Sequence, residues 1–337
     1  MTLDNPTTRA VLCGAGLLAA SLAAVLLSVA EGAHATDLGA ALSHIWSDDG
    51  SNVAFAVRAL RLPRALCAVG VGAALALSGA LIQIVIRNPL GDPGLTGVTA
   101  GAAFGVALTL TLLSASPSLL VGAGVAGGAL AAFLTYSLAR SPAGLEPLRV
   151  ILAGIAVTVF FLAATSAVMV VSRSSMQTLY FWMVGGFINR GWAEFHLFWP
   201  VASAAAVAVF AMSPILKLLQ FDDTMAAGMG VSSQRWRIAA GALSVILAAA
   251  SVAVAGPLAF VGFVAPHLAR LCLGKDAAPG MLTWLITTML MGAALVVWAD
   301  AATRVIFAGR VPAGALITIL GGLAFLTLAR RGVRHAV

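Results

Sequence analysis

Long apolar runs separated by short polar breaks are the main pattern of this chain. Runs of about 20 residues match the thickness of the hydrocarbon core of a bilayer. The pattern therefore predicts a polytopic, all-α membrane protein in which residues 1–337 form one transmembrane domain of about ten helices. The predicted spans are 10–30, 60–86, 94–113, 118–140, 147–171, 193–214, 236–255, 258–273, 280–303 and 312–330.

Two of these spans have features of their own. The first run is 21 residues long, whereas the apolar core of a secretory signal has about 7–15, so we expect a retained helix. The eighth run is short and follows Gly256-Pro257, which indicates a broken or tilted start, because proline cannot continue a helix.

Composition excludes the other broad classes. The chain is 61% hydrophobic and 9% charged, while soluble domains carry about 25% charged residues. A membrane β-barrel would show alternating segments of roughly ten residues, and the chain does not have them. The net charge of +7 does not predict nucleic-acid binding, because Lys and Arg collect in the cytoplasmic loops of membrane proteins.

The distribution of basic residues predicts the orientation. With the N-terminus inside, twelve of the 19 Lys and Arg residues lie on the cytoplasmic side and seven lie outside. This bias favours both termini in the cytoplasm. The three cysteines lie within apolar runs and are expected to be reduced thiols, with no disulfide and no metal site. They are Cys13, Cys67 and Cys272.

The polar stretch 86–97 interrupts the apolar pattern between the second and third spans. Proline cannot continue a helix and restricts the residue before it, so we predict a sharp cytoplasmic turn. Gly101 and Gly105 follow at a spacing that lets two helices approach closely in lipid. We call 86–97 the inner turn and assign to it Arg87, Asn88, Pro89, Asp92 and Pro93.

Three polar or aromatic features invite functional interpretations. His267 has no carboxylate or second His at ligand spacing, so we interpret it as a hydrogen-bonding residue. Asp300 precedes Arg304 by four residues, which favours a local ion pair over a proton-coupling acid. The aromatic residues of 180–192 are typical of an outer interfacial helix, with a gating role as the alternative.

Several motifs together resemble the FecCD family of permease subunits from ATP-binding-cassette importers for ferric siderophores, haem and cobalamin. The resemblance covers about residues 55–330 and implies a type II importer permease fold, with ten helices per subunit and two subunits forming the pathway. The motifs are RLPR (61–64), SGALIQ (78–83), RNPLGDPGLTG (87–97) and GPLAFVGFVAPHLAR (256–270).

The resemblance also implies partners. The chain has no G-x-x-x-x-G-K-[ST] loop, so it is not expected to be an enzyme. ATP and Mg²⁺ belong to two copies of a separate ATPase, and no cofactor is expected on this chain. Segment 215–235 looks like the family's coupling helix, with an ordinary solvated loop as the alternative. The residues assigned to coupling are Asp222, Asp223, Thr224, Ala227, Gly228, Gly230 and Arg235.

On the outer side the resemblance implies that a periplasmic or lipid-anchored binding protein docks on Arg61, Arg64 and Arg304. The alternative is that these arginines reach the lipid headgroups. The chain departs from the family at Arg310, where a Glu is usual, and at 321–325, where a proline is missing. The first departure leaves the docking surface open, and the second alters a kink in the tenth helix.

The function implied is import of a bulky iron chelate, a ferric siderophore before haem or cobalamin, by alternating access in a bacterial cytoplasmic membrane. The second permease is either an identical copy or a paralogue. An ion-coupled transporter would need a carboxylate near the bilayer centre, and the predicted spans place none there. A membrane enzyme is disfavoured because HExxH and G-x-S-x-G are absent.

Overall fold

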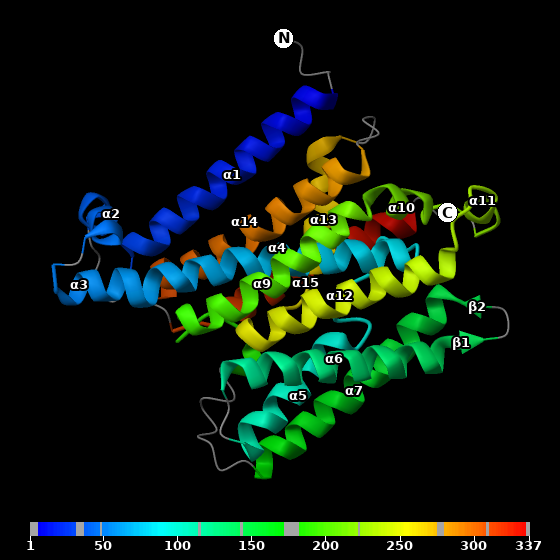
Figure 1. Cartoon of the computed structure of the whole chain (residues 1–337), viewed down its shortest axis with the longest axis horizontal. Helices are drawn as coiled ribbons and strands as arrows, with labels where there is room; N and C mark the ends of the chain where they lie inside the picture. Colours follow the sequence, from blue (N-terminus) through cyan, green and yellow to red (C-terminus); the bar gives the residue numbers. More distant parts are fainter. Residues whose placement is uncertain are drawn as a thin grey trace.

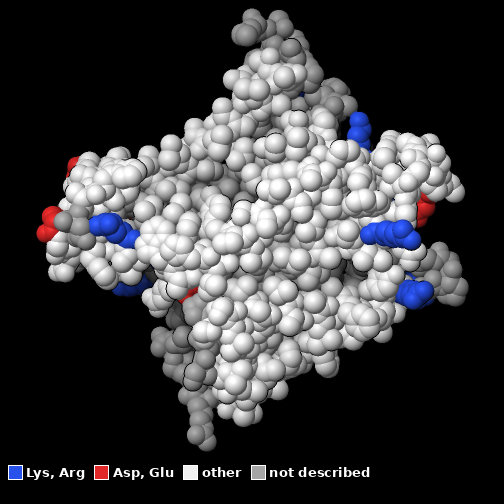
Figure 2. Space-filling view, in the orientation of Figure 1, with Lys and Arg blue, Asp and Glu red and all other residues white. Residues whose placement is uncertain are grey.

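The computed structural model describes residues 6–31, 37–47, 49–113, 116–141, 144–171, 182–221, 223–274, 280–307 and 310–334. Long helices run side by side, with α4 through the middle and α5, α6 and α7 grouped along one side (Figure 1). Charged side chains gather toward the two ends of the face in Figure 2, and the band between them is largely uncharged. That distribution fits a protein whose middle lies in lipid.

The ten predicted spans are confirmed as ten apolar helices. Among the described residues seven helices are long and apolar enough to cross a membrane, α5 and α13 are shorter, and α15 is apolar over Ala313–Thr327. The ten helices are α1 (Pro6–Ala30), α4 (Leu62–Val85), α5 (Val98–Leu112), α6 (Pro117–Ala139), α7 (Pro147–Val171), α9 (Trp192–Ala211), α12 (Ser233–Ala255), α13 (Val261–Leu273), α14 (Met281–Phe307) and α15 (Ala313–Arg334).

Short elements mark the two ends of the molecule. One end carries α2 (Leu38–Trp46), α3 (Asn52–Phe55) and the π-helical turn η1 (Ala56–Arg61), which leads into α4. The opposite end carries α10 (Ser213–Leu218), α11 (Asp223–Gly228) and a hairpin of two-residue strands, β1 (Arg140–Ser141) and β2 (Gly144–Leu145). We call these the outer and inner ends, after the orientation predicted from the basic residues.

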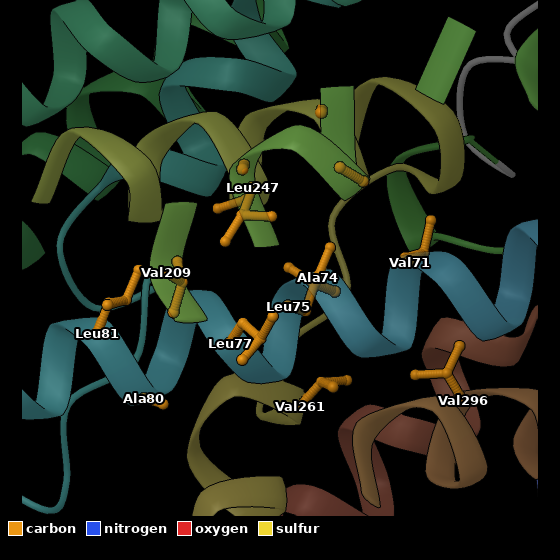
Figure 3. Packing of buried hydrophobic residues seen from close by; sticks show 14 of the residues in the cluster. Val71, Ala74, Leu75, Leu77, Ala80, Leu81, Val209, Leu247, Val261 and Val296 are labelled. Carbon is orange, nitrogen blue, oxygen red and sulfur yellow. The ribbon is translucent and has the colours of Figure 1, made fainter. Parts of the chain in front are cut away.

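Helix α4 is the centre of the packing. It contacts α14, α12, α13 and α9, and Figure 3 shows its Leu75, Leu77 and Leu81 among residues of the neighbouring helices. Two of its glycines touch partner backbones, because a Cβ on Gly79 would overlap the carbonyl of Gly262, and one on Gly72 would overlap that of Gly292. Small residues bring helices this close in lipid, where packing replaces the hydrophobic effect.

The predicted small-residue contact of α5 is also confirmed. A Cβ on Gly101 would overlap the Gly127 carbonyl of α6, and one on Gly105 would overlap the Ala123 carbonyl. The start of the eighth span is broken as predicted. Gly256 has φ +69°, the next residues are not helical, and α13 begins at Val261.

The prediction of three reduced cysteines is wrong for two of them. Cys13 of α1 and Cys272 of α13 form a disulfide, with their Cα atoms 6.4 Å apart. They are 259 positions apart in the sequence, so only the packing of α1 across the end of α13 brings them together. Cys67 is free and buried.

A buried charge cluster closes the outer end. Asp300 has no exposed side-chain surface and binds Arg64 and Arg304, each at 2.7 Å. The predicted pair of Asp300 with Arg304 is thus confirmed, and Arg64 joins it from α4. Arg304 and Arg61 also donate to the last carbonyl groups of α1, at 28, 29 and 30, which lack partners within their own helix.

We expect Asp300→Asn to destabilise the protein by about 3–5 kcal/mol, because it leaves two buried guanidinium groups without their anion. Thermal unfolding in detergent measures the loss. Glu146→Gln is the matched control, since the Glu146–Arg149 pair is more than half exposed and exposed pairs contribute about 0.2–1 kcal/mol. Equal stabilities of the two variants would contradict a stabilising role for the cluster.

Candidate functional site

The inner turn has a fixed geometry made by its polar residues. Arg87 takes a positive φ of 48° directly after α4, which turns the chain away from the helix axis. The Asn88 side chain accepts the N–H of Leu90 at 2.9 Å, and the Asp92 side chain accepts that of Gly94 at 2.7 Å. Such local bonds stabilise turns. The predicted sharp turn is confirmed.

Arg87 joins this turn to helix α11. Its guanidinium donates to the Asp223 carboxylate at 2.7 Å and to the carbonyl groups of Leu219 and Phe221. Arg237, from α12, donates to the same carboxylate oxygen at 3.0 Å and to the Val85 carbonyl at 3.1 Å. We call Arg87, Asp223 and Arg237 the Asp223 clasp. It ties the end of α4, the start of α11 and the start of α12 together.

Helix α11 forms where the sequence predicts a short helix. It begins at Asp223 and is followed by Gly230 with φ +80°, while Asp222 lies outside the described residues. Ala226, which is not one of the predicted coupling residues, is buried, and the described coupling residues are exposed. Exposed apolar side chains accompany them, namely Phe221 (43%), Met225 (57%) and Met229 (46%). The exposed coupling residues are Thr224, Ala227, Gly228, Gly230 and Arg235.

Asp92 is buried between the inner turn and α13. A Cβ on Gly262 would lie 3.1 Å from its Oδ2, and the N–H of Phe263 faces the carboxyl without completing a well-aligned hydrogen bond. Burial raises the pKa of the Asp92 carboxyl from 3.8 to about 6, and the N–H groups of Gly94 and Phe263 offset part of that rise. The carboxyl lies at the N-terminal end of α13, where the helix dipole favours a negative charge.

Gln83 and Arg270 make a second link between the inner turn and α13. The Gln83 amide donates to the carbonyl groups of Gly91 and Gly262 at 3.3 and 3.4 Å. Its carbonyl accepts from Arg270 at 2.9 Å, and Arg270 lies 4.6 Å over the Trp284 ring. Sequence reasoning did not assign these residues, although both stand in the quoted motifs. Their pairing depends on the contact of α4 with α13.

A cleft of about 430 Å³ opens beside the inner turn. Gly94 and Thr99 line it from one side, residues 257–259 line it at the approach to α13, and residues of α15 such as Ile319 close another side. Met183 and Val184 line it from the stretch 182–192, which we call the outer segment. Most of these side chains are apolar, so the cleft offers few polar groups for the specific binding of a ligand.

The outer segment near the cleft is held by its backbone. The N–H of Gly186 donates to Ala255 at 2.7 Å, and the N–H of Gly314 donates to Gly185 at 3.0 Å. The described part, 182–192, therefore joins the end of α12 to the start of α15. The first two residues of the predicted aromatic segment 180–192 lie outside the described residues, as does 172–179, the rest of the predicted periplasmic segment 172–192. Trp192 donates its indole N–H to the Arg58 carbonyl at 2.8 Å.

The three arginines predicted to dock a binding protein face inward to other groups of the chain. The side chains of Arg64 and Arg304 are 18% and 7% exposed and contact Asp300, while Arg61 binds the end of α1. Docking on them stays a prediction.

Arg310, which stands where the family usually has a Glu, is exposed. At 321–325, where the chain lacks the proline that is usual in the family, α15 is continuous and Gly321 packs against Phe260.

Comparisons with known proteins agree with this arrangement. The chain is 34% identical over 319 residues to the probable siderophore transport system permease protein YfiZ of Bacillus subtilis, covering 93% of this chain and 94% of the relative. It is 33% identical to the hemin transport system permease protein HmuU of Yersinia pestis, covering 88% and 86%.

A solved structure shares the fold. The permease of a metal-chelate type ABC transporter, captured facing inward, superimposes with a TM-score of 0.80 at 27% identity, over 95% of this chain and 99% of that one. The family model of the FecCD transport family matches residues 18–331. The chain therefore belongs to the FecCD family of ABC importer permeases, which serve iron chelates, haem or cobalamin.

Proposed function

We propose that this chain is one of two permease subunits of an ATP-driven importer that moves a ferric siderophore into the bacterial cytoplasm. The observation that carries the proposal is the Asp223 clasp, because it connects an exposed helix, α11, with the turn that lines the cleft. In this proposal two ATPase subunits, which hold ATP and Mg²⁺, bind α11, and their movement reaches the cleft through the inner turn.

The exposed face of α11 supports a protein partner at the inner end. Apolar surface is exposed on α11 at Met225 and on either side of it at Phe221 and Met229. Thr224 and Arg235 are exposed nearby in the chain. Flexible methionine side chains suit binding surfaces that must adapt to a partner. A loop that faced only water would gain nothing from exposing them.

The apolar cleft supports a substrate that is recognised elsewhere. Its lining has few charged or hydrogen-bonding side chains, whereas tight and specific pockets combine apolar walls with well-placed polar groups. We therefore assign specificity to a separate binding protein at the outer end. A second permease, identical or paralogous, would cover the other side of the pathway. Haem and cobalamin remain the alternative substrates.

The first test is the isolation of the assembled complex. The chain is extracted in mild detergent, and stoichiometric partners are identified by mass spectrometry. We expect a Walker-motif ATPase and a binding protein, and we expect that binding protein to bind ferric siderophores more tightly than hemin or cobalamin in a titration. Recovery of the chain without an ATPase in several detergents would overturn the ATP-driven proposal.

The second test concerns the clasp. Arg87→Ala or Asp223→Ala removes a charge-assisted hydrogen bond of about 1.5 kcal/mol, so we expect substrate uptake by proteoliposomes to fall roughly tenfold. The double variant should lose less than the sum of the two single losses, because both changes break the Arg87–Asp223 contact. Arg149→Ala is the control, since it removes an exposed cation at the same end. Fully additive losses, or an equal loss in the control, would contradict transmission through the clasp.

The third test uses the buried Asp92 carboxyl. Its folded-state pKa, about 6, lies above the ordinary 3.8, so the stability gained from its bound proton is present below about pH 4 and is lost as pH rises through about 6. Asp92→Asn has no proton to lose there. We expect the variant's stability relative to the native chain to rise between about pH 4 and pH 6 and then to stay level.

Thermal unfolding in detergent across that pH range measures the difference between the two proteins. A difference that stays constant from acid to neutral pH would show that the Asp92 carboxyl is not buried as described. Uptake at neutral pH by the same variant reports separately whether the turn needs the negative charge.

A further inference from the structure

The disulfide between α1 and α13 lies at the inner end of the molecule. Cys13 is on the second turn of α1, and Cys272 is in the last turn of α13. Arg9, one turn before Cys13, donates from Nε to the Cys272 carbonyl at 3.0 Å. Gly274 leaves room for the Arg9 guanidinium, because a Cβ there would lie 2.5 Å from its Nη1. The two helix ends therefore meet with or without the covalent bond.

The orientation predicted from the basic residues places the start of α1 and the end of α13, and with them the disulfide, on the same side as α11 and the inner turn. Under the proposed function this end faces the cytoplasm, where thiols are kept reduced. A disulfide there persists only while an oxidant outcompetes the cellular reductants. Both cysteines are partly exposed, whereas Cys67 is fully buried, so small redox reagents have access to the pair and not to the third thiol.

The bond would join two helices that other contacts already tie to different parts of the molecule. Helix α1 is already fixed to α14, because Trp298 donates to the Ala20 carbonyl at 3.0 Å and Arg304 donates to that of Ser28. Helix α13 is fixed to the inner turn through Arg270 and Gln83. A covalent bond from Cys13 to Cys272 joins these two groups of helices at the inner end.

We propose that Cys13 and Cys272 form a reversible redox site that locks α13 against α1 and slows the transport cycle when oxidised. The two thiols lose two protons and two electrons as the S–S bond forms, and hydrogen peroxide takes them up to give two molecules of water. A cytoplasmic dithiol reverses the step by exchange and is itself oxidised to a disulfide. The orientation in this proposal rests on the proposed function.

The test has a chemical arm on the permease alone. After denaturation, maleimide labelling counts free thiols by mass spectrometry in preparations treated with dithiothreitol or with hydrogen peroxide. We expect three labels after reduction and one, on Cys67, after oxidation. A second dithiothreitol treatment should restore all three. A count that does not change with redox treatment would overturn the proposal, whatever the transported substrate.

The functional arm uses the permease assembled with its ATPase in proteoliposomes, with ATPase activity as the readout. We expect peroxide to lower the activity several-fold and dithiothreitol to restore it. Cys13→Ser and Cys272→Ser should be insensitive, and Cys67→Ser should respond like the native chain. Unchanged activity in a fully oxidised sample would also overturn the proposal. Failure to assemble with any ATPase would instead count against the proposed function and leave the thiol count to stand.

Discussion

The backbone contact between α4 and α13 is the constraint on which the inner half of the structure depends. Gly79 and Gly262 touch without intervening side chains, so the two helices lie close enough for Gln83 to span both the inner turn and the start of α13. In lipid, helices gain little from hydrophobic association, and such close packing supplies the attraction. A side chain at either glycine would separate the helices. The Gln83 amide and the Asp92 carboxyl would then lose their contacts with Gly262 at the start of α13.

Much of the fold could be predicted from the sequence because the bilayer imposes a simple length rule on apolar runs. The ten spans, the broken start of α13, the close-packing glycines of α5 and the short helix α11 were all visible as local patterns. Long-range pairs were not. Nothing near Cys13 indicates Cys272, and nothing near Asp300 indicates Arg64, because these contacts arise from how the helices pack.

The candidate site shows the same division. The inner turn could be located from its prolines and glycines, and Asp223 could be recognised as the start of a helix. The sequence did not indicate that Asp223 binds both Arg87 and Arg237. This contact forms only because the fold brings three helix ends to one point. The predicted docking arginines illustrate the converse. They lie together at one end of the helices, and their guanidinium groups satisfy Asp300 and the end of α1.

The outer segment at 182–186 lies beside the cleft but owes its place to main-chain bonds with Ala255 and Gly314. Main-chain bonds of this kind do not depend on which side chains the segment carries. A residue such as Val184 can therefore be replaced while these main-chain bonds keep the segment in place. The side chains that line the cleft can vary in this way while the main chain around them keeps its shape.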